Sequence, residues 1–398
     1  MPLIKTINKF KNKKLHTPNH KIFFSVSSEG FGHSSRILAI AREFSHDEML
    51  IGSYNYAYDK IKSMGLPCIE LNQELKLIGQ GGAFDVGKTI IKNRVWALNF
   101  NKLVNDEMEI IRASGASCVV ADGRLVPVIA AEKLSLPCIV ITNQSAFYPF
   151  FAKDSALIRV FGKSFDWIMK TWLISTEEIM IPDFPPPYSV CLPNLSHNYK
   201  VMKRTRFVGP MVYWDNREIK PMPKPSAYKP YIVVTLGGHS YRRPIFDNMI
   251  KVARKMPNVM FDIFTSFTVE DVPDNVRLMG MVPNIVEYMK AADIVITQAG
   301  HSTAMELLTM GKQSIIIPDL NQTEQENNAR RMSELGVAET IVYNNLSCDR
   351  LIEVISNMLG ETRYTEKAKY FLQMAEVIQG RKRAAKILRD YSTRLQCY

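Results

Sequence analysis

Three short turns in this chain combine glycine with histidine and a hydroxyl side chain. Each follows an apolar segment and precedes a helical pattern; residues 30–34 read GFGHS, 237–240 read GGHS and 300–303 read GHST. Glycine lets the backbone approach a ligand closely, and a helix N-terminus offers free N–H groups and a partial positive charge that favour phosphate. The three junctions therefore predict phosphate handling by Gly30, Gly32, Gly237, Gly238, His239, Ser240, Gly300, His301, Ser302 and Thr303.

The histidine in each turn adds acid–base chemistry. A neutral imidazole can take a proton from a hydroxyl, and a protonated one can offset pyrophosphate charge; a surface or capping histidine is the plainer interpretation. We consider His33 and Asp122 as candidates for a catalytic base. Asp122 ends the apolar run 118–121, where a turn or cap residue would give the same pattern. No two of these histidines have a short ligand spacing, so no metal site is expected.

Polar side chains after two later strands could bind sugar hydroxyls. Glu306 lies one turn inside the helix that Ser302 is expected to cap, and its carboxylate can accept hydroxyl hydrogen bonds or simply complement the helix dipole. Further on, eight of the ten residues 319–328 carry a carboxylate or carboxamide. As a solvated loop they need no function; as a sugar-binding loop they supply the donors and acceptors required. The candidates there are Gln322, Glu324, Gln325 and Asn328.

The elements that must position these residues alternate between strand and helix. Strands are predicted at 21–26, 48–52, 68–71, 118–121 and 138–142, and again at 231–236, 259–265, 276–279, 294–297 and 314–318. This alternation predicts the α/β class, with two Rossmann-like doubly wound domains facing a cleft. We divide the chain into a basic tail (1–20), an acceptor-binding domain (21–214), a Pro-rich linker (215–229), a nucleotide-sugar domain (230–374) and a helical tail (375–398).

Composition sets broader limits. The 398 residues are 46% hydrophobic and 22% charged, as in a soluble globular protein, and the net charge of +11 suits an anionic partner. Six cysteines lie far apart, which indicates a reducing compartment. No secretory signal is recognised, and the longest uncharged stretch, 134–152, is too polar to span a bilayer. We expect a cytoplasmic protein.

Together these residues resemble a known family. The stretch 300–306, the strand ending at Pro318 and the pattern Gln322-x-Glu324-Gln325-x-x-Asn328 are similar to the donor-site signature of GT-B glycosyltransferases of family 28. That family includes the peptidoglycan N-acetylglucosaminyltransferase that makes lipid II. Residues 29–36, EGFGHSSR, also resemble the first glycine-rich loop of uncharacterised archaeal and bacterial relatives. The resemblance covers most of residues 21–337.

The resemblance implies roles for single residues. Glu306 would hold the ribose, Glu324 and Gln325 the transferred sugar, residues 237–240 the diphosphate and the backbone near Met281 the base. His33 would lie near the reacting centre. His301 departs from the family's small residue, and Glu324 stands where glutamine is common, which leaves the sugar open.

The resemblance also implies the reaction. A hexose or N-acetylhexosamine would pass from a nucleotide-sugar, most simply a UDP-sugar, to an acceptor hydroxyl with inversion and without a covalent intermediate. The nucleotide-sugar would be a co-substrate, and no separate cofactor is expected. No D-x-D metal motif occurs, so helix N-termini and His239 would meet the leaving-group charge.

A second motif offers an alternative. Residues 82–89, GAFDVGKT, fit the P-loop pattern of nucleoside triphosphatases. The preceding residues 75–81 are a poor strand, and the first strand is already assigned, so we favour an acceptor-side loop. A non-catalytic nucleotide-sugar-binding protein and a sugar epimerase on the same fold also stay open. No nucleic-acid-binding module is recognised.

Two segments bear on the acceptor. Residues 157–173 place charged residues on one narrow face and aromatic residues around the rest, a pattern of a core helix or, alternatively, of a helix that enters a membrane surface. The Lys-rich residues 1–20 would suit an anionic membrane or be a disordered tail. We therefore include lipid-linked sugars and glycolipids among the candidate acceptors, with peripheral binding at the inner face of the cell membrane.

Overall fold

The computed structural model describes residues 21–74, 79–80, 83–84, 96–152, 155–224, 230–237, 240–280, 282 and 284–394. The basic segment 1–20, most of the P-loop-like segment 82–89, and the predicted donor-site residues Gly238, His239 and Met281 lie outside the described residues. The expectations for these positions stay predictions.

The first domain is built on a seven-stranded parallel sheet with the order β3-β2-β1-β6-β7-β8-β9. Its central strands are continuous apolar runs, as strands buried on both faces must be. The strands are β1 (Lys21–Val26), β2 (Met49–Ser53), β3 (Cys68–Glu70), β6 (Ala116–Asp122), β7 (Cys138–Ile141), β8 (Glu178–Ile181) and β9 (Thr205–Phe207); the helices are α2 (Phe31–Ala41), α3 (Asn55–Ser63), α5 (Trp96–Ser114), α6 (Val126–Lys133), η1 (Tyr148–Phe151), α7 (Ala156–Ser175), η2 (Leu192–Asn194) and α8 (Tyr199–Arg204). A short antiparallel pair, β4 (Gly79–Gln80) and β5 (Ala83–Phe84), stands apart from this sheet.

The second domain repeats the design with a six-stranded parallel sheet, β12-β11-β10-β13-β14-β15. Helices cover both of its faces. The strands are β10 (Tyr231–Gly237), β11 (Met260–Thr265), β12 (Val276–Met279), β13 (Ile294–Thr297), β14 (Ser314–Ile316) and β15 (Ala338–Thr340); the helices are η3 (Ser240–Arg242), α9 (Arg243–Lys255), α10 (Val286–Ala291), α11 (His301–Met310), α12 (Thr323–Glu334), η4 (Tyr343–Asn345), α13 (Cys348–Gly360) and α14 (Arg363–Ile378). The last described helix, α15 (Gly380–Arg394), packs on the first domain. The predicted α/β class with two Rossmann-like domains is confirmed.

Strand order reverses once in each sheet, and the reversal fixes where ligands bind. In the first domain β1 lies between β2 and β6, and in the second β10 lies between β11 and β13. Open α/β sheets hold ligands in the crevice at the carboxyl ends of such strands. The turns after β1, β6, β10 and β13 therefore form the expected site. They contain the three predicted glycine–histidine turns, and the turn after β6 follows Asp122, whereas the predicted residues 322–328 come after β14.

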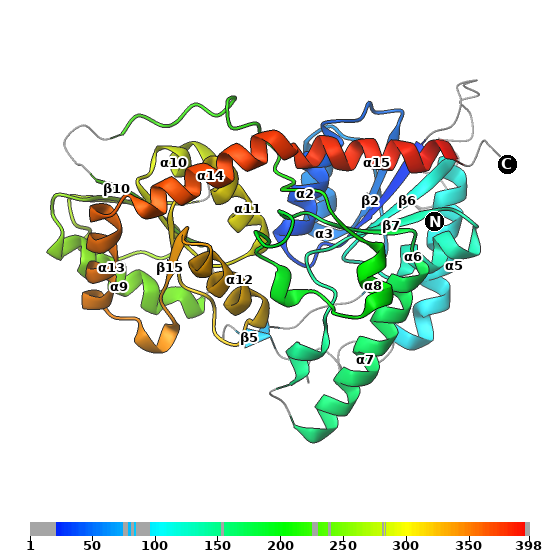
Figure 1. The fold of residues 1–398 in the computed structure, drawn as a ribbon, viewed down its shortest axis with the longest axis horizontal. Helices are drawn as coiled ribbons and strands as arrows, with labels where there is room; N and C mark the ends of the chain where they lie inside the picture. The colour runs from blue at the N-terminus through cyan, green and yellow to red at the C-terminus, as the bar shows by residue number, and fades with distance from the viewer. Residues whose placement is uncertain are drawn as a thin grey trace.

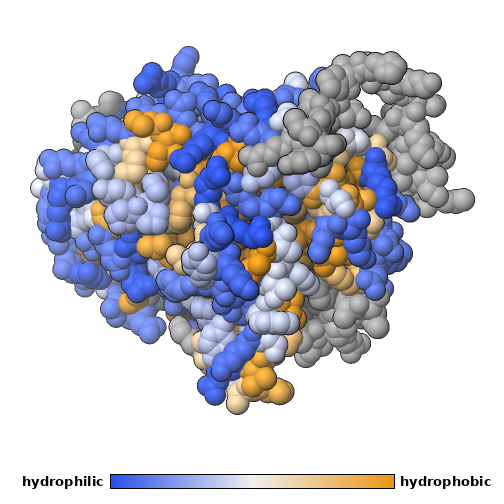
Figure 2. Space-filling model, turned by 45° about the vertical axis from the view of Figure 1, so that its right-hand side comes forward, coloured by the Kyte–Doolittle hydropathy of each residue, from blue (hydrophilic) through white to orange (hydrophobic). Residues whose placement is uncertain are grey.

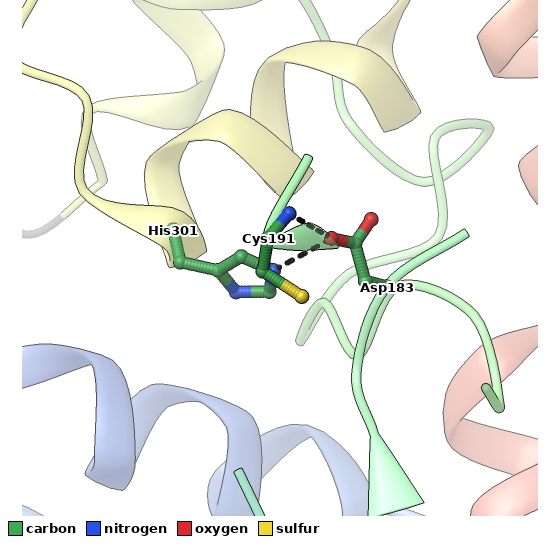
Figure 3. A group of neighbouring side chains, drawn as sticks. All are labelled: Asp183, Cys191 and His301. Atoms are coloured by element: carbon green, nitrogen blue, oxygen red, sulfur yellow. Dashed lines mark hydrogen bonds and ion pairs between the residues drawn. The ribbon is translucent and has the colours of Figure 1, made fainter. Parts of the chain in front are cut away.

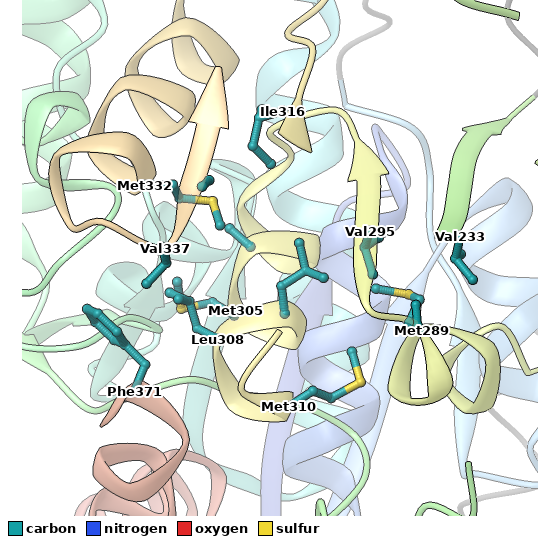
Figure 4. Packing of buried hydrophobic residues seen from close by; sticks show 14 of the residues in the cluster. Val233, Met289, Val295, Met305, Leu308, Met310, Ile316, Met332, Val337 and Phe371 are labelled. Carbon is teal, nitrogen blue, oxygen red and sulfur yellow. The ribbon is translucent and has the colours of Figure 1, made fainter. Parts of the chain in front are cut away.

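Helix α11 packs between the second sheet and α14. In Figure 4, Met305 and Leu308 of α11 lie among side chains of the sheet such as Ile316, and Phe371 of α14 lies on the opposite side. All of these side chains are almost fully buried. This packing fixes the axis of α11, whose first turn carries a predicted donor-binding sequence.

The C-terminal helical segment belongs structurally to both domains. α14 packs on α11, and α15 continues past it onto the first domain, so that the two helices span the molecule along one edge in Figure 1. Four buried residues of α15, namely Ala384, Ala385, Ile387 and Leu388, join the core formed by β1, α2 and β6. The predicted tail is thus a covering layer of the first domain.

The chain crosses between the domains at two places that touch. One crossing follows β9 and contains Gly209; the other is the α14–α15 junction at Gly380. A Cβ on Gly380 would lie 2.3 Å from the carbonyl oxygen of Pro210, and one on Gly209 would lie 2.3 Å from Ile378. Only glycine allows the backbones of the two crossing segments to approach this closely.

The described part of the Pro-rich linker is less solvated than its composition predicts. Ile219 is 8% exposed and joins the core of the second domain. Lys290 of α10 donates to the carbonyl oxygens of Asn216 and Ile219. The linker up to residue 224 is therefore attached to the second domain.

Candidate active site

His33 and Asp122 meet at the switch point of the first domain. His33 lies in the first turn of α2 and Asp122 ends β6, and Nδ1 of the imidazole lies 2.6 Å from Oδ1 of the carboxylate. Asp122 is fully buried, whereas the His33 side chain is 25% exposed. Gly123 makes room for the ring, since a Cβ there would lie 2.6 Å from Cε1 of His33.

Arg36 anchors this pair. Its Nε donates to Oδ2 of Asp122 at 2.6 Å and its Nη2 donates to Oδ1. Burial alone would raise the pKa of Asp122, but the charges and hydrogen bonds of Arg36 and His33 outweigh burial and lower it. Asp122 is therefore a carboxylate.

The ionised carboxylate decides which nitrogen of His33 is basic. Because an ionised carboxylate only accepts, Nδ1 of His33 must carry the proton that it donates to Oδ1 of Asp122. Nη2 of Arg36 also lies 2.9 Å from Nδ1, and both of these nitrogens then direct a proton at Asp122. Nε2 then carries the lone pair, which is the tautomer that a general base requires. Arg36 was missed as a site residue, although it stands at the end of the EGFGHSSR stretch that carried the resemblance.

The N-termini of α2 and α11 face each other across the domains. A Cβ on Gly32 would lie 2.7 Å from Oγ of Ser302, so the two helix starts are in contact distance. Ser302 and Thr303 are partly exposed. Two helix N-termini directed at one space favour an anion there. Gly30 and Gly300 directly precede these two helices, and Gly237 ends β10.

Glu306 lies one turn into α11 and has no hydrogen bond or ion pair among the residues that the structure describes. Desolvation by burial raises its pKa to about 7. A carboxylate held in this way can accept hydrogen bonds from hydroxyl groups of a ligand, which would favour its ionised form.

Gln325 is occupied within its own loop. Its Oε1 accepts from the backbone N–H of Asp319 at 2.9 Å, and its Nε2 donates to the Asp319 carboxylate at 3.1 Å. Arg242 forms a two-pronged ion pair with the same carboxylate, 2.9 and 2.5 Å long. This pair ties the turn after β10, which includes the exposed Ser240, to the turn after β14. Arg242 follows the GGHS turn by two residues, and this proximity was its only sequence signal.

Asn328 is buried and serves the domain interface. Its Nδ2 donates to the carbonyl oxygen of Ala299 at 2.9 Å, and its Oδ1 accepts from Asn194 of the first domain at 3.0 Å. Asn327 donates to the other end of the Asn194 amide at 2.8 Å. Asn328 therefore holds the turn after β13 and the start of α12 against the first domain, while Gln322 precedes α12 and is partly exposed.

His301 also lies in the domain interface. Its Nε2 contacts Oδ2 of Asp183, which follows β8, at 3.2 Å, and both residues are almost fully buried. Figure 3 shows the imidazole and the Asp183 carboxylate on either side of Cys191. The three side chains are of metal-binding types and lie within 4.8 Å of one another. Asp183 could not have been paired with His301 from their separation in sequence.

Hydrogen bonds account for this cluster. Oδ2 of Asp183 accepts from the backbone N–H of Cys191 at 2.8 Å and from the Ser189 hydroxyl at 3.1 Å, in addition to His301. Burial would raise the pKa of Asp183, yet the bonds and charge of His301 and the Cys191 amide lower it. Burial raises the pKa of the Cys191 thiol, which disfavours the thiolate that metals bind. The cluster is a hydrogen-bonded junction that fixes the start of α11.

Asn143 and Glu324 form another link between the domains. Asn143 follows β7, Glu324 lies in the first turn of α12, and Nδ2 of the amide donates to Oε1 of the carboxylate at 2.8 Å. Oδ1 of Asn143 accepts from Nη1 of Arg36 at 3.0 Å. The predicted sugar-binding residue Glu324 is therefore connected to the His33–Asp122 pair.

The cleft thus contains the parts of a group-transfer site. One wall carries a histidine held by a buried carboxylate. The other carries a helix N-terminus, polar loops and the carboxylate of Glu306, which has no partner among the described residues. This arrangement can remove a proton from a hydroxyl while a phosphorylated leaving group is stabilised opposite.

Comparison with known proteins agrees with this description. Residues 254–385 match the model of the glycosyltransferase family 28 C-terminal domain. An uncharacterised glycosyltransferase from Methanosarcina mazei is 30% identical over 92% of this chain and 97% of its own length. A UDP-N-acetylglucosamine–N-acetylmuramyl-(pentapeptide) pyrophosphoryl-undecaprenol N-acetylglucosamine transferase from Bacillus cereus is 25% identical over 71% of this chain and 76% of its own length.

Solved structures show the same fold at low sequence identity. The glycotransferase of kitacinnamycin superposes with a TM-score of 0.72 and 15% identity over 93% of this chain and 98% of its own. MurG of Acinetobacter baumannii superposes with a TM-score of 0.61 and 14% identity over 93% and 99%.

Proposed function

Because the chain belongs to the family 28 glycosyltransferases and has their GT-B fold, we propose that it transfers a hexose or N-acetylhexosamine from a UDP-sugar to an acceptor hydroxyl with inversion. The observation that carries this proposal is the position of two groups. His33, held by Asp122, lies at the start of α2, and α11 begins opposite it. Glu306 lies one turn inside α11 and forms no bond with any residue in the described part of the chain.

The proposed reaction is a single displacement. Nε2 of His33 takes the proton of the acceptor hydroxyl as its oxygen bonds to the anomeric carbon. The bond from that carbon to the diphosphate breaks at the same time, and the nucleoside diphosphate leaves on the opposite face. The resulting imidazolium is stabilised by the carboxylate of Asp122, and the leaving charge by the N-terminus of α11.

We assign the nucleotide to the second domain. Glu306 would accept hydrogen bonds from the ribose hydroxyls, and the turns after β10 and β13 would surround the diphosphate. The Arg242–Asp319 ion pair supports this by holding the turns after β10 and β14 together. Gln322 and Glu324 would contact the transferred sugar.

We also propose that the acceptor is lipid-linked and is reached at an anionic membrane surface. The interpretation of residues 157–173 as a core helix is wrong for one side of α7, where Leu157, Val160, Phe161, Trp167 and Ile168 are exposed. The other side packs on η1: a Cβ on Gly162 would meet Phe151, and Asp166 accepts from the backbone N–H groups of Phe147 and Tyr148 at the start of η1.

The surroundings of this exposed side are basic and aromatic. Hydrophobic side chains gather at the lower tip of the molecule in Figure 2, where α7 projects in Figure 1. A groove of about 570 Å³ runs between α7 and α8 and is lined by Trp167, Lys170, Thr171, Ile174, Asn198, Tyr199 and Lys200. Apolar side chains beside lysines suit acyl chains beneath anionic headgroups. Among the helices that the structure describes, none is long and apolar enough to cross a membrane.

The first experiment measures binding of UDP, GDP, ADP and ATP by calorimetry, without added metal and then with magnesium. The Glu306→Ala and Lys88→Ala variants are measured in parallel. UDP binding that is lost in Glu306→Ala and kept in Lys88→Ala supports the proposed donor site. ATP binding that requires magnesium and Lys88 would refute it and favour the P-loop alternative.

A further inference from the structure

We propose that Asn143 is a positioning residue that couples binding of the donor sugar to alignment of the catalytic base, an inference that rests on the function proposed above. Asn143 belongs to the first domain and contacts Glu324 of the second. It also contacts Arg36, which holds Asp122. It therefore connects the sugar-binding wall of the cleft to the base.

The chemistry of the two partners fixes the orientation of the Asn143 amide. A guanidinium group only donates hydrogen bonds, and a carboxylate only accepts them. The oxygen must therefore face Arg36 and the NH2 group must face Glu324, as found at 3.0 and 2.8 Å. A side chain with only donors, only acceptors or no polar atom cannot make both contacts.

Arg36 transmits the position of this amide to the base. Its guanidinium is planar, and three of its nitrogens are used: Nη1 on Asn143, and Nε and Nη2 on Asp122. Because the plane is rigid, a rotation that follows Asn143 also moves the two donors on Asp122. Asp122 in turn orients the imidazole of His33 through Nδ1.

Glu324 has a carboxylate oxygen with which it can bind the donor sugar. Its Oε1 is taken by Asn143, and no bond of Oε2 is found within the described ranges, so this oxygen is available to a sugar hydroxyl. A sugar that bonds to Oε2 fixes the carboxylate, and the fixed carboxylate holds Asn143 and Arg36. His33 is then aligned only when a sugar with a suitably placed hydroxyl is bound. The rate of turnover therefore depends on which sugar the donor carries.

The experiment uses the full chain with UDP-N-acetylglucosamine, UDP-glucose and UDP-galactose as donor probes, and follows UDP release with a membrane lipid extract as acceptor. Asn143→Ala removes both contacts. Asn143→Asp keeps an oxygen for Arg36 but sets a carboxylate against Glu324. We expect each variant to lower UDP release at least about tenfold with the donor that the wild type uses best, while the Kd for UDP changes less than about twofold.

The control is Arg331→Ala. Arg331 also lies on α12 and contacts the first domain, through the carbonyl oxygens of Ser189 and Pro187, but it does not contact Arg36. Its loss should lower UDP release less than about threefold. Circular dichroism melts verify that every variant is folded. An Arg331→Ala loss equal to that of Asn143→Ala would attribute the effect to interface packing and overturn the proposal.

A double-mutant cycle tests the coupling itself. If Asn143 and Glu324 act through one bond, Asn143→Ala combined with Glu324→Ala should be within about threefold of the worse single variant. Asn143→Ala combined with Glu306→Ala should multiply the two single losses. Multiplication in both pairs, or wild-type turnover in Asn143→Asp, would overturn the proposal; a wild type that binds no UDP would overturn the proposed function as well.

Discussion

Nδ1 of His33 contacts Oδ1 of Asp122 at 2.6 Å although 89 positions separate the two residues in the chain. If this pair is the catalytic base, His33→Ala and Asp122→Asn should each lower turnover by about 10² to 10⁴-fold. UDP binding should be unchanged, because the proposed nucleotide site lies on the second domain. Single-turnover kinetics and calorimetry measure the two quantities.

The matched control is His46→Ala, since His46 is exposed on the same domain. Its turnover should equal that of the wild type. Full activity in Asp122→Asn would exclude the proposed role of the pair.

Glu306 should make both stability and UDP affinity depend on pH. Burial raises its pKa from 4.5 to about 7 in the folded protein. Between these values the folded state holds a proton that the unfolded state has released, so this residue's contribution to stability falls as pH rises toward 7. Glu306→Gln should therefore be more stable than wild type at pH 8, by about 1 to 3 kcal/mol, and equally stable near pH 4. Urea unfolding at the two pH values tests this.

The same ionisation should control the nucleotide. Ribose hydroxyls donate to the carboxylate form, so UDP should bind wild type more tightly at pH 8 than at pH 6, whereas Glu306→Gln should show no such rise. A wild-type affinity that falls over this interval would contradict the ribose assignment.

Two glycines separate the effect of backbone strain from the effect on the base. Gly123 and Gly65 both have a positive φ, but a Cβ on Gly123 would meet His33 whereas one on Gly65 would meet nothing within 4 Å. Alanine at Gly65 should lower the free energy of unfolding by about 1 kcal/mol through backbone strain alone, and alanine at Gly123 should lower it further because its Cβ also meets His33. Only Gly123→Ala should also lower turnover, by at least about tenfold. Equal turnover in the two variants would show that the position of the His33 imidazole does not depend on a glycine at position 123.

The exposed side of α7 should determine binding to vesicles. Replacing Leu157, Phe161 and Trp167 with serine should lower co-sedimentation with phosphatidylglycerol vesicles at least about tenfold, because each side chain contributes up to about 2 kcal/mol when buried in acyl chains. Val377→Ser on α14 is the control, since Val377 is 83% exposed. Binding should weaken with added salt. If the triple variant binds vesicles as well as the wild type does, α7 is not the membrane-binding element.

The strands that were predicted have a physical reason in common. Segments such as Ile22–Phe24 in β1 and Ile232–Val234 in β10 are buried on both faces, so their sequences are continuous apolar runs. The missed strands of the two parallel sheets are β8, β9 and β15, of which β9 and β15 are three-residue edge strands and β8 begins with Glu178; the two-residue strands β4 and β5 were missed as well. Short or charge-bearing strands of this kind lack the apolar signal.

The candidate site also has one part that could be predicted from the sequence and one that could not. The turns after β1 and β13 could be predicted, because glycine at a strand-to-helix junction indicates a helix N-terminus directed at a ligand. The partners of the predicted residues could not. Arg36 reaches Asp122, and Asn143 reaches Glu324, across 86 and 181 positions. Only the folded chain brings such groups together, and what they bond to determines their charge and orientation.

The position of α15 has a consequence for biosynthesis. Every strand of the first domain leaves the ribosome before any residue of α15 is made, yet Ala384 and Leu388 complete its core beside β1 and α2. The nascent first domain must therefore carry an uncovered apolar face throughout translation of the second domain. Such a face is a binding site for chaperones that recognise exposed hydrophobic surface. The core of the first domain is therefore complete only after α15 has been synthesised and has docked.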